Sequence, residues 1–290
     1  MPNTRLRPLA FIATLLLITF TVGSTAETRF VPTPEGDHFY YQPAEAAQDI
    51  LVIAHGTRGK NETAQQTAQT FLNRWTHFAE THAVALIVPV FDDARFGNTG
   101  GGYGGYRGLF GKHVPADDFV IDLVTAYQAD HALPQDPFLL YGHSAGGQFV
   151  IRFLVRHPNR VRRAVTSAPG RYSYPSRSAP WPYGAGPLTR SITWPDGTTQ
   201  AIRVEGVLRD YANAAGKVHV IVGSQDTKPQ PQRPLHLGKN RVEFARSWVT
   251  AMNESARRFG AAGRARVTVI PGIGHNSRAL TPHAQRYILD

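Results

Sequence analysis

Ser144 stands at the centre of a Gly-x-Ser-x-Gly pentapeptide, residues 142–146, which directly follows the apolar residues 138–141. A tight turn from a strand into a helix at this point would expose the hydroxyl of Ser144 at the carboxyl edge of a sheet, where a nucleophile can attack a bound carbonyl. The pentapeptide alone is a weak indication, since Gly and Ser are common residues. The rest of the chain must supply the partners that a serine nucleophile needs.

Two residues further along the chain are suited to activate Ser144. A serine hydroxyl is a weak nucleophile at neutral pH: it needs an imidazole to accept its proton, and the imidazole needs a carboxylate to hold it in the correct tautomer. Asp226 follows the apolar residues 218–222, and His275 follows residues 267–270 in a Pro-Gly-x-Gly-His sequence. Both positions correspond to loops at strand ends, in the chain order Ser, Asp, His. We predict that these three residues form a catalytic triad.

The reaction also needs two backbone N–H groups to stabilise the oxyanion that forms on the attacked carbonyl. Ala145 is one candidate, because its N–H lies directly after the serine at the positive end of the helix that the turn opens. Thr57 is the other, in the loop that follows the apolar residues 49–54, where Gly56 allows a close approach of the backbone.

The remaining histidines in these regions are weaker candidates for proton transfer. His55 and His143 belong to the two turn motifs themselves and are predicted to be structural, whereas His236 and His283 follow no predicted strand. Histidines and carboxylates nowhere show the spacing of metal ligands, and the chain contains no cysteine. We therefore expect no metal, no other cofactor, no disulfide and no thiolate nucleophile.

The elements that must position these residues alternate along the chain. Continuous apolar runs, typical of strands buried on both faces of a parallel sheet, predict strands at residues 49–54, 84–90, 138–141, 161–167, 217–222 and 266–270, with a possible edge strand at 38–41. Apolar residues at helical spacing predict helices at 62–82, 115–130, 145–157, 241–259 and near 282–289. This alternation predicts an α/β fold, a mostly parallel central sheet with helices on both faces, in a single domain spanning residues 27–290.

An aromatic-rich segment interrupts the alternation at residues 168–213. The sequence Pro195-Asp196-Gly197 lies between two strand-like runs and predicts a β-hairpin turn. We interpret the segment as a small cap-like insertion over the carboxyl edge of the sheet. Trp181 and Tyr183 within it are candidate substrate-binding residues, because aromatic side chains combine a large apolar area with a polar group.

The composition of the chain limits the classes of partner that it can bind. The formal net charge of +10 comes from scattered basic residues without a nucleic-acid-binding module, so we expect a solvated surface and no nucleic-acid partner. The glycine-rich segment 97–108 lacks the Gly-Lys-Ser/Thr of a phosphate-binding loop and is predicted to be a rim loop.

Residues 1–26 predict a cleaved secretory signal peptide, because two arginines precede an apolar run too short to span a bilayer and small residues end it. We expect a secreted or periplasmic protein with no stable membrane association.

These motifs together carry a family resemblance. His55-Gly56-Thr57, the Gly-His-Ser-Ala-Gly elbow around Ser144, Asp226 and Gly274-His275 resemble an α/β-hydrolase across nearly the whole mature chain. The Gly-His-Ser-Ala-Gly-Gly-Gln elbow, Trp181-Pro182-Tyr183-Gly184 and the late Gly-x-Gly-His resemble more narrowly the secreted bacterial esterases related to polyhydroxybutyrate depolymerases and feruloyl esterases. The chain departs from many lipases in having His-Gly-Thr-Arg-Gly in place of His-Gly-Gly-Gly, and it lacks the cysteines of many relatives.

The leading hypothesis is a secreted serine hydrolase that cleaves a small-molecule or polymeric carboxylic ester through an acyl-enzyme intermediate. One alternative keeps the triad and cleaves an amide or peptide, because the fold does not choose the substrate. The other is a non-catalytic binding protein on the same scaffold, which predicts a lost triad member, although none is lost. The sequence leaves open the identity of the ester and the oligomeric state.

Overall fold

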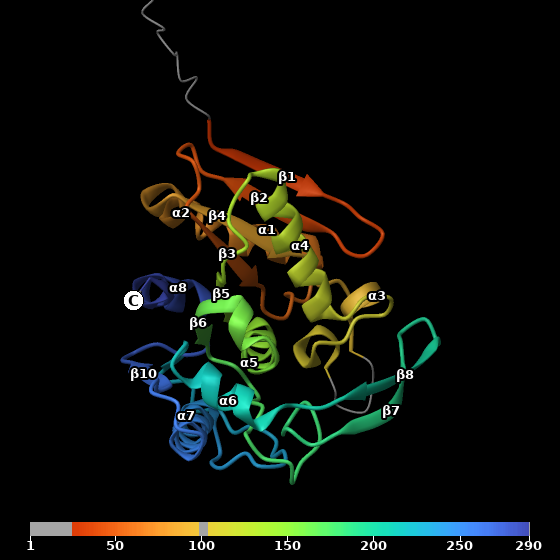
Figure 1. Ribbon diagram of the computed structural model, residues 1–290, viewed down its shortest axis with the longest axis vertical. Coiled ribbons are helices and arrows are strands. Elements are labelled where there is room, and N and C mark those ends of the chain that lie inside the picture. Colours follow the sequence, from red (N-terminus) through yellow and green to blue (C-terminus); the bar gives the residue numbers. More distant parts are fainter. Residues whose placement is uncertain (1–24, 99–103, 290) are drawn as a thin grey trace, which may run out of the picture.

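The computed structural model describes residues 25–98 and 104–289. Almost all of the predicted signal peptide 1–26 therefore lies outside the described residues, as do positions 99–103 of the glycine-rich segment. A central sheet of eight strands runs through the molecule in the order β1-β2-β4-β3-β5-β6-β9-β10 (Figure 1). Its strands are β1 (Glu27–Val31), β2 (His38–Gln42), β3 (Asp49–Ala54), β4 (Val84–Pro89), β5 (Phe138–His143), β6 (Val161–Ser167), β9 (Val218–Gly223) and β10 (Arg266–Ile270).

In this sheet the pairs along β4-β3-β5-β6-β9-β10 are all parallel, and only β1 and β2 are paired antiparallel to their neighbours. This pairing confirms the mostly parallel sheet. The central strands β3, β4 and β5 are buried along nearly their whole length, because helices cover the sheet on both sides. Parallel pairing also brings the carboxyl ends of β3, β5, β6, β9 and β10 to one edge, where the loops that carry the predicted site residues begin.

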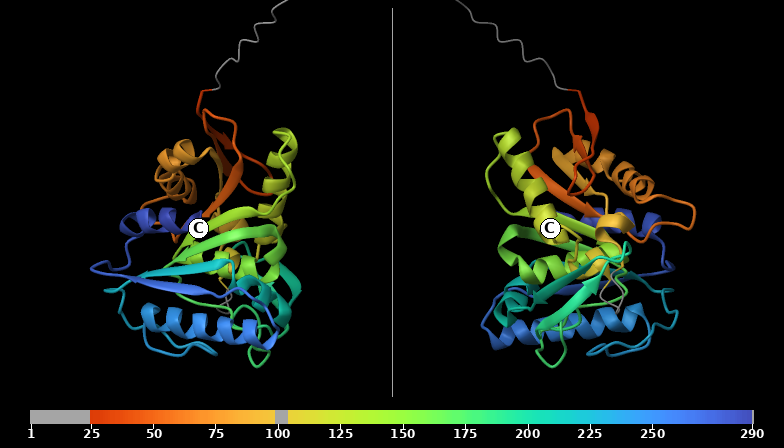
Figure 2. Two further views of the ribbon diagram at one scale, coloured as in Figure 1. Left: turned by 60° about the vertical axis from the view of Figure 1, so that its left-hand side comes forward. Right: turned by 90° about the vertical axis from the view of Figure 1, so that its right-hand side faces the viewer.

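Helices lie on both faces of the sheet, as predicted. The α-helices are α1 (Ala64–Asn73), α2 (Thr76–His82), α3 (Asp93–Phe96), α4 (Ala116–Asp130), α5 (Ala145–Arg156), α6 (Leu208–Ala215), α7 (Arg241–Arg258) and α8 (Ser277–Ile288), and the 3₁₀ helices are η1 (Gly105–Gly108) and η2 (Pro158–Arg160). Figure 2 shows α1, α2 and α8 on one side of the sheet and α4 and α5 on the other. Among the described residues, none of these helices has the length and apolar character needed to cross a membrane.

The helix predicted at 62–82 is in fact two helices that meet at Trp75. The N–H of Trp75 donates to the carbonyl of Leu72, three residues back, which tightens the last turn of α1 and ends it. The indole of Trp75 is fully buried, so the break lets a large side chain enter the core between the two helices. The helical period persists across the break, which explains why the sequence pattern does not reveal it.

The last helix begins earlier than predicted. It starts at Ser277, directly after the loop that carries His275, because the Asn276 side chain accepts a hydrogen bond from the N–H of Ala279 and caps the first turn. Pro282, which suggested a start, lies inside α8. The exposed edge strand β1 and the short helix α6 were not predicted either.

The aromatic-rich insertion contains the predicted hairpin. Strands β7 (Leu188–Thr193) and β8 (Thr199–Val204) pair antiparallel and form a separate two-stranded sheet. The side chain of Asp196 accepts a hydrogen bond from the N–H of Thr198 in the connecting turn, and Gly197 has a φ of 82°, which favours glycine. The hairpin leads away from the sheet (Figure 1), so only the first part of the insertion, up to Tyr183, reaches the carboxyl edge near β5.

Candidate active site

Ser144 occupies the single position between strand β5 and helix α5. Its backbone has φ 53° and ψ −107°, a conformation that costs a non-glycine residue about 1–3 kcal/mol. The N–H of Ser144 donates to the carbonyl of Ser167 at 2.8 Å and holds the turn against β6. A Cβ on Gly146 would lie 1.9 Å from the carbonyl oxygen of Ala54, so only glycine permits this approach of α5 to β3. The sequence thus forms a strained elbow that presents the half-buried Ser144 side chain at the sheet edge.

The structure brings Ser144, His275 and Asp226 into one hydrogen-bonded line. The Nε2 atom of His275 lies 3.0 Å from the Oγ of Ser144, and its Nδ1 lies 2.7 Å from an oxygen of Asp226. Because the carboxylate can only accept, Nδ1 carries the proton and Nε2 is left to accept the proton of the serine hydroxyl. The arrangement can therefore convert the hydroxyl of Ser144 into a nucleophile.

Arg241 completes the surroundings of the carboxylate. Its Nη1 atom lies 3.0 Å from the second oxygen of Asp226, whose side chain is almost completely buried. Burial raises the pKa of the Asp226 carboxyl, but the hydrogen bond from His275 and the charge of Arg241 lower it by more, so the net shift is below the usual value. Asp226 is therefore ionised at neutral pH. Sequence reasoning did not identify Arg241, which begins α7 and carries no local motif.

The two predicted oxyanion donors lie next to the nucleophile. Ala145 is the first residue of α5, and Thr57 lines the same cavity as Ser144. Neither backbone N–H has an acceptor among the described residues, so both are available to a ligand. His55 fixes the Thr57 loop, since its Nε2 accepts a hydrogen bond from the N–H of Phe91 at 3.0 Å and its Nδ1 donates to Gly56 at 2.8 Å.

Like His55, His143 and His236 are buried and structural. Nδ1 of His143 lies 2.7 Å from the Oγ of Ser167, and the rings of His143 and His275 pack 4.9 Å apart. The Nε2 of His236 accepts from the N–H of Tyr172 at 2.9 Å. Burial lowers the pKa of His55 to about 4, of His143 to about 3 and of His236 to about 4, so all three are neutral at neutral pH. His283 is absent from the hydrogen-bonded line at Ser144.

These low pKa values predict a loss of stability in mild acid. Below the usual histidine pKa of 6.5 the unfolded chain binds protons that the folded protein cannot, so the free energy of unfolding is highest above that pH. It should fall by about 1.4 kcal/mol per pH unit for each buried histidine as the pH drops toward 4. Urea denaturation between pH 7.5 and 4.5 measures this slope. The variant His236→Gln should reduce it, whereas His77→Gln, at an exposed position, should not; a flat profile would contradict the prediction.

A cavity of about 340 Å³ opens in front of Ser144. The predicted substrate-binding residue Tyr183 lines it, together with Thr57, Gln148 and several arginines. Trp181 does not line the cavity, so its prediction as a substrate-binding residue is wrong. Its side chain is fully buried, and its indole N–H donates to the carbonyl of Gly108 at 2.8 Å. Trp181 therefore packs in the core, although the next residue, Pro182, lines the cavity. Gly104 and Arg107 of the glycine-rich segment also line the cavity, as expected of a rim loop.

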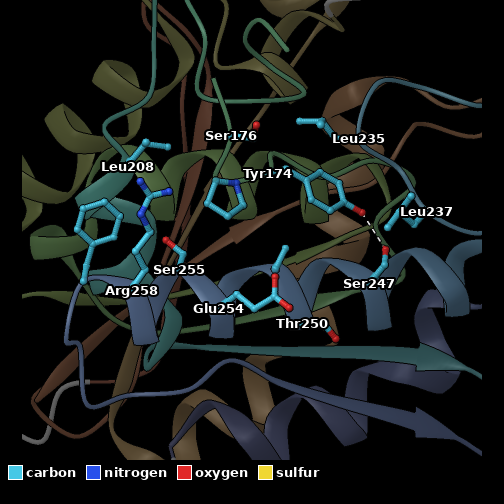
Figure 3. A pocket seen from close by; sticks show the side chains of 13 residues that line it. Tyr174, Ser176, Leu208, Leu235, Leu237, Ser247, Thr250, Glu254, Ser255 and Arg258 are labelled. Carbon is cyan, nitrogen blue, oxygen red and sulfur yellow. Dashed lines mark hydrogen bonds between the residues drawn. The ribbon is translucent and has the colours of Figure 1, made fainter. Parts of the chain in front are cut away.

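A second, larger cavity lies elsewhere. It measures about 730 Å³ and is lined by Tyr174, Leu208, Leu235 and one side of α7, with the Tyr174 hydroxyl 2.9 Å from Ser247 (Figure 3). None of Ser144, Asp226 and His275 lines it. In the part of the chain that the structure describes, no group of three His, Asp or Glu side chains is placed to hold a metal ion.

Comparisons with known proteins agree with this architecture. No curated protein matches the chain. Two solved structures are similar over most of both chains. Poly(aspartic acid) hydrolase-1 from Sphingomonas sp. KT-1 has a TM-score of 0.70 and 19% identity, and the match covers 93% of this chain and 100% of that one. LpqC, the poly(3-hydroxybutyrate) depolymerase from Bordetella parapertussis, has a TM-score of 0.70 and 21% identity, and the match covers 90% of this chain and 88% of that one. At these identities the likeness shows the fold.

The family itself is shown by sequence. Residues 95–272, more than half of the chain, match the model of a hydrolase family described as serine aminopeptidase, S33. The matched segment includes the elbow at Ser144 and extends past Asp226. Together with the sheet order and the structural neighbours, this match confirms the α/β-hydrolase fold expected from the sequence. The chain belongs to the serine aminopeptidase S33 family of α/β-hydrolases.

Proposed function

We propose that the protein is an exported serine hydrolase that cleaves carboxylic esters through an acyl-enzyme intermediate. The observation that carries this proposal is the hydrogen-bonded line Ser144, His275 and Asp226 beside a cavity, with contacts of 3.0 Å and 2.7 Å. The carboxylate fixes the imidazole, the imidazole accepts the serine proton, and the cavity offers space for a substrate. This is the arrangement that acyl transfer by a serine requires.

The proposed reaction proceeds in two halves. Ser144 Oγ forms a bond to the ester carbonyl carbon while His275 Nε2 takes the hydroxyl proton; the carbon–oxygen bond to the alcohol then breaks and His275 returns the proton to the leaving oxygen. In the second half a water attacks the acyl-serine, His275 takes a proton from that water, and Ser144 leaves with this proton as the carboxylic acid is released. The N–H groups of Thr57 and Ala145 would stabilise the oxyanion in both halves.

Ester cleavage is favoured over amide cleavage by the sequence resemblance to secreted bacterial esterases and by the named substrate of LpqC, a polyester. Amide cleavage is the second candidate. The family description names an aminopeptidase, and the other similar structure is named for the hydrolysis of poly(aspartic acid), a polyamide. Both reactions use the same nucleophile, base and oxyanion donors, so the hydrogen-bonded line itself does not separate them.

One experiment tests the nucleophile and the export together. Protein recovered from the periplasm or medium of an expressing bacterium is treated with a fluorophosphonate and its intact mass is measured. We expect a chain that begins at Glu27 and carries one phosphonyl adduct on Ser144. An unlabelled protein would contradict the proposed chemistry, and a chain that retains residues 1–26 would contradict the proposed processing. The ratio of kcat/KM for a matched ester and amide of the same acyl group then decides between the two substrate classes; a ratio in favour of the amide overturns ester cleavage.

A further inference from the structure

Arginines dominate the cavity in front of Ser144. Five of them line it: Arg107, Arg152, Arg171, Arg233 and Arg241. No aspartate or glutamate is among the described residues of its wall. Among the described residues, only Arg241 of these five has an acidic partner, Asp226, which lies behind the wall and also binds His275. The other four have no carboxylate within 4.0 Å in the described part of the chain, and residues 99–103 contain no acidic residue in their sequence.

Arg152 is the most informative of the five. Its side chain is 1% exposed, and its partners are neutral: Nε donates to the carbonyl of Pro182 at 3.0 Å, and Nη1 donates to the carbonyl of Arg107 at 2.7 Å. Burial, together with the charges of Arg107 and Arg171, lowers the pKa of Arg152 to about 10, yet the guanidinium stays cationic at neutral pH. A buried cation without a counter-charge destabilises a fold, so its position at a cavity wall would favour the binding of an anion there.

The remaining arginines converge on the same space from separate segments. Arg107 lies in η1, Arg171 in the loop after β6 and Arg233 in the loop between β9 and α7. Among the described residues each donates only to a backbone carbonyl of its own segment. Arg171, Arg233 and Arg241 line the same cavity, and burial together with the charges of Arg233 and Arg241 lowers the pKa of Arg171. Their convergence is unfavourable unless the cavity holds a negative group.

The basic lining continues on the other side of Thr57. A neighbouring cavity of about 390 Å³ shares Thr57 and Arg107 with the first and adds Arg58 and Lys60. Of the described residues that line this neighbouring cavity, the one acidic side chain, Asp93, is already paired with Arg58 at 2.8 Å. Cationic side chains therefore lie on both sides of the predicted oxyanion donor.

We propose that the arginine-lined cavity binds a carboxylate that the substrate carries near its scissile carbonyl, on the acyl or the leaving side, so that the hydrolase selects anionic substrates over neutral ones. The inference rests on the proposed function, since it takes Ser144 as the nucleophile. Guanidinium groups donate two parallel hydrogen bonds to a carboxylate, and the unpaired arginines supply such donors at one side of the nucleophile. Binding this group orients the scissile carbonyl toward Ser144 Oγ.

The test compares pairs of substrates that differ only in charge. In the first pair the charge lies on the acyl group: mono-4-nitrophenyl glutarate has a free terminal carboxylate, and its methyl ester is the neutral partner with the same leaving group. In the second pair, 4-acetoxybenzoate and 4-acetoxybenzamide, the charge lies on the phenol that leaves. We expect kcat/KM to favour the carboxylate by about tenfold or more in at least one pair, and the preference to shrink with added salt. A preference below threefold in both pairs overturns the proposal. A phosphonate analogue that is better than the carboxylate overturns the choice of carboxylate.

Variants assign the preference to the cavity. Arg171→Gln and Arg233→Gln remove the less buried cations and should each lower kcat/KM more for the carboxylate substrate than for its neutral partner, so that the ratio falls about tenfold. Arg152→Lys keeps a cation at the buried position without the guanidinium fork and should also lower the ratio. Arg246→Gln, on the exposed side of α7 and outside the cavity, is the matched control and should leave the ratio unchanged. An unchanged ratio in all three cavity variants overturns the proposal.

The two proposals fail in different ways. If Ser144→Ala retains turnover of both members of a pair, the proposed chemistry is wrong. If turnover depends on Ser144 but charge makes no difference, the chemistry holds and only the anion selectivity is wrong.

Discussion

Ser144→Ala is expected to lower kcat/KM for 4-nitrophenyl butyrate by about 10⁴-fold or more. Alanine removes the hydroxyl oxygen that lies 3.0 Å from His275 Nε2 and that would form the acyl bond. The backbone elbow should persist, because the strained turn is held by the Ser144 N–H bond to Ser167 and not by the side chain. The loss is measured as the steady-state rate of 4-nitrophenolate release, followed by its absorbance.

The control for this variant is Ser191→Ala, which removes an exposed hydroxyl on strand β7 far along the insertion. It should leave kcat/KM within a factor of two of the original protein. Thermal denaturation of both variants shows whether they are folded. Substantial turnover by a folded Ser144→Ala protein would contradict the assignment of the nucleophile.

Asp226→Asn is expected to lower kcat by about 10⁴-fold with a smaller change in KM. Asparagine can donate its amide to Nδ1 of His275, which would place the imidazole proton on Nε2 and block acceptance of the serine proton. The 2.7 Å contact with His275 and the 3.0 Å contact with Arg241 preserve the position of the side chain, so the loss should lie in chemistry rather than in folding.

Kinetics of Asp226→Asn with the same ester, alongside Asp122→Asn at an exposed position of α4, measure this effect. Asp122→Asn should behave like the original protein. A loss smaller than tenfold in a folded Asp226→Asn variant would show that the carboxylate does not control the tautomer of His275. The rate of fluorophosphonate labelling of Asp226→Asn should fall together with kcat, because labelling requires the same activated hydroxyl of Ser144.

Several predictions from local patterns agree with the structure. Buried strands have apolar runs, helices have a 3.6-residue period, and the Pro-Asp-Gly turn forms the predicted hairpin, because each pattern depends on nearest neighbours along the chain. Errors occur where a local pattern is compatible with two structures. The helical period continues through the break at Trp75, and Pro282 suggested a helix start although Asn276 provides the cap.

The sequence by itself determined which residues could come together at the elbow. Ser144, Asp226 and His275 each follow a strand of the parallel sheet, and parallel strands place their carboxyl ends at one edge, so their proximity follows from strand order without knowledge of the loops.

Only the tertiary structure decided what surrounds that line. Trp181 and Tyr183 are two residues apart, yet one is in the core and the other lines the cavity, because the path of an irregular loop has no period that a sequence displays. Arg241 meets Asp226, and Arg152 meets the backbone of Arg107, through contacts between elements far apart in the chain. In the sequence the basic residues are scattered, whereas the fold gathers five of them around the cavity in front of Ser144. Their mutual repulsion is the physical basis for the proposed selectivity toward negatively charged substrates.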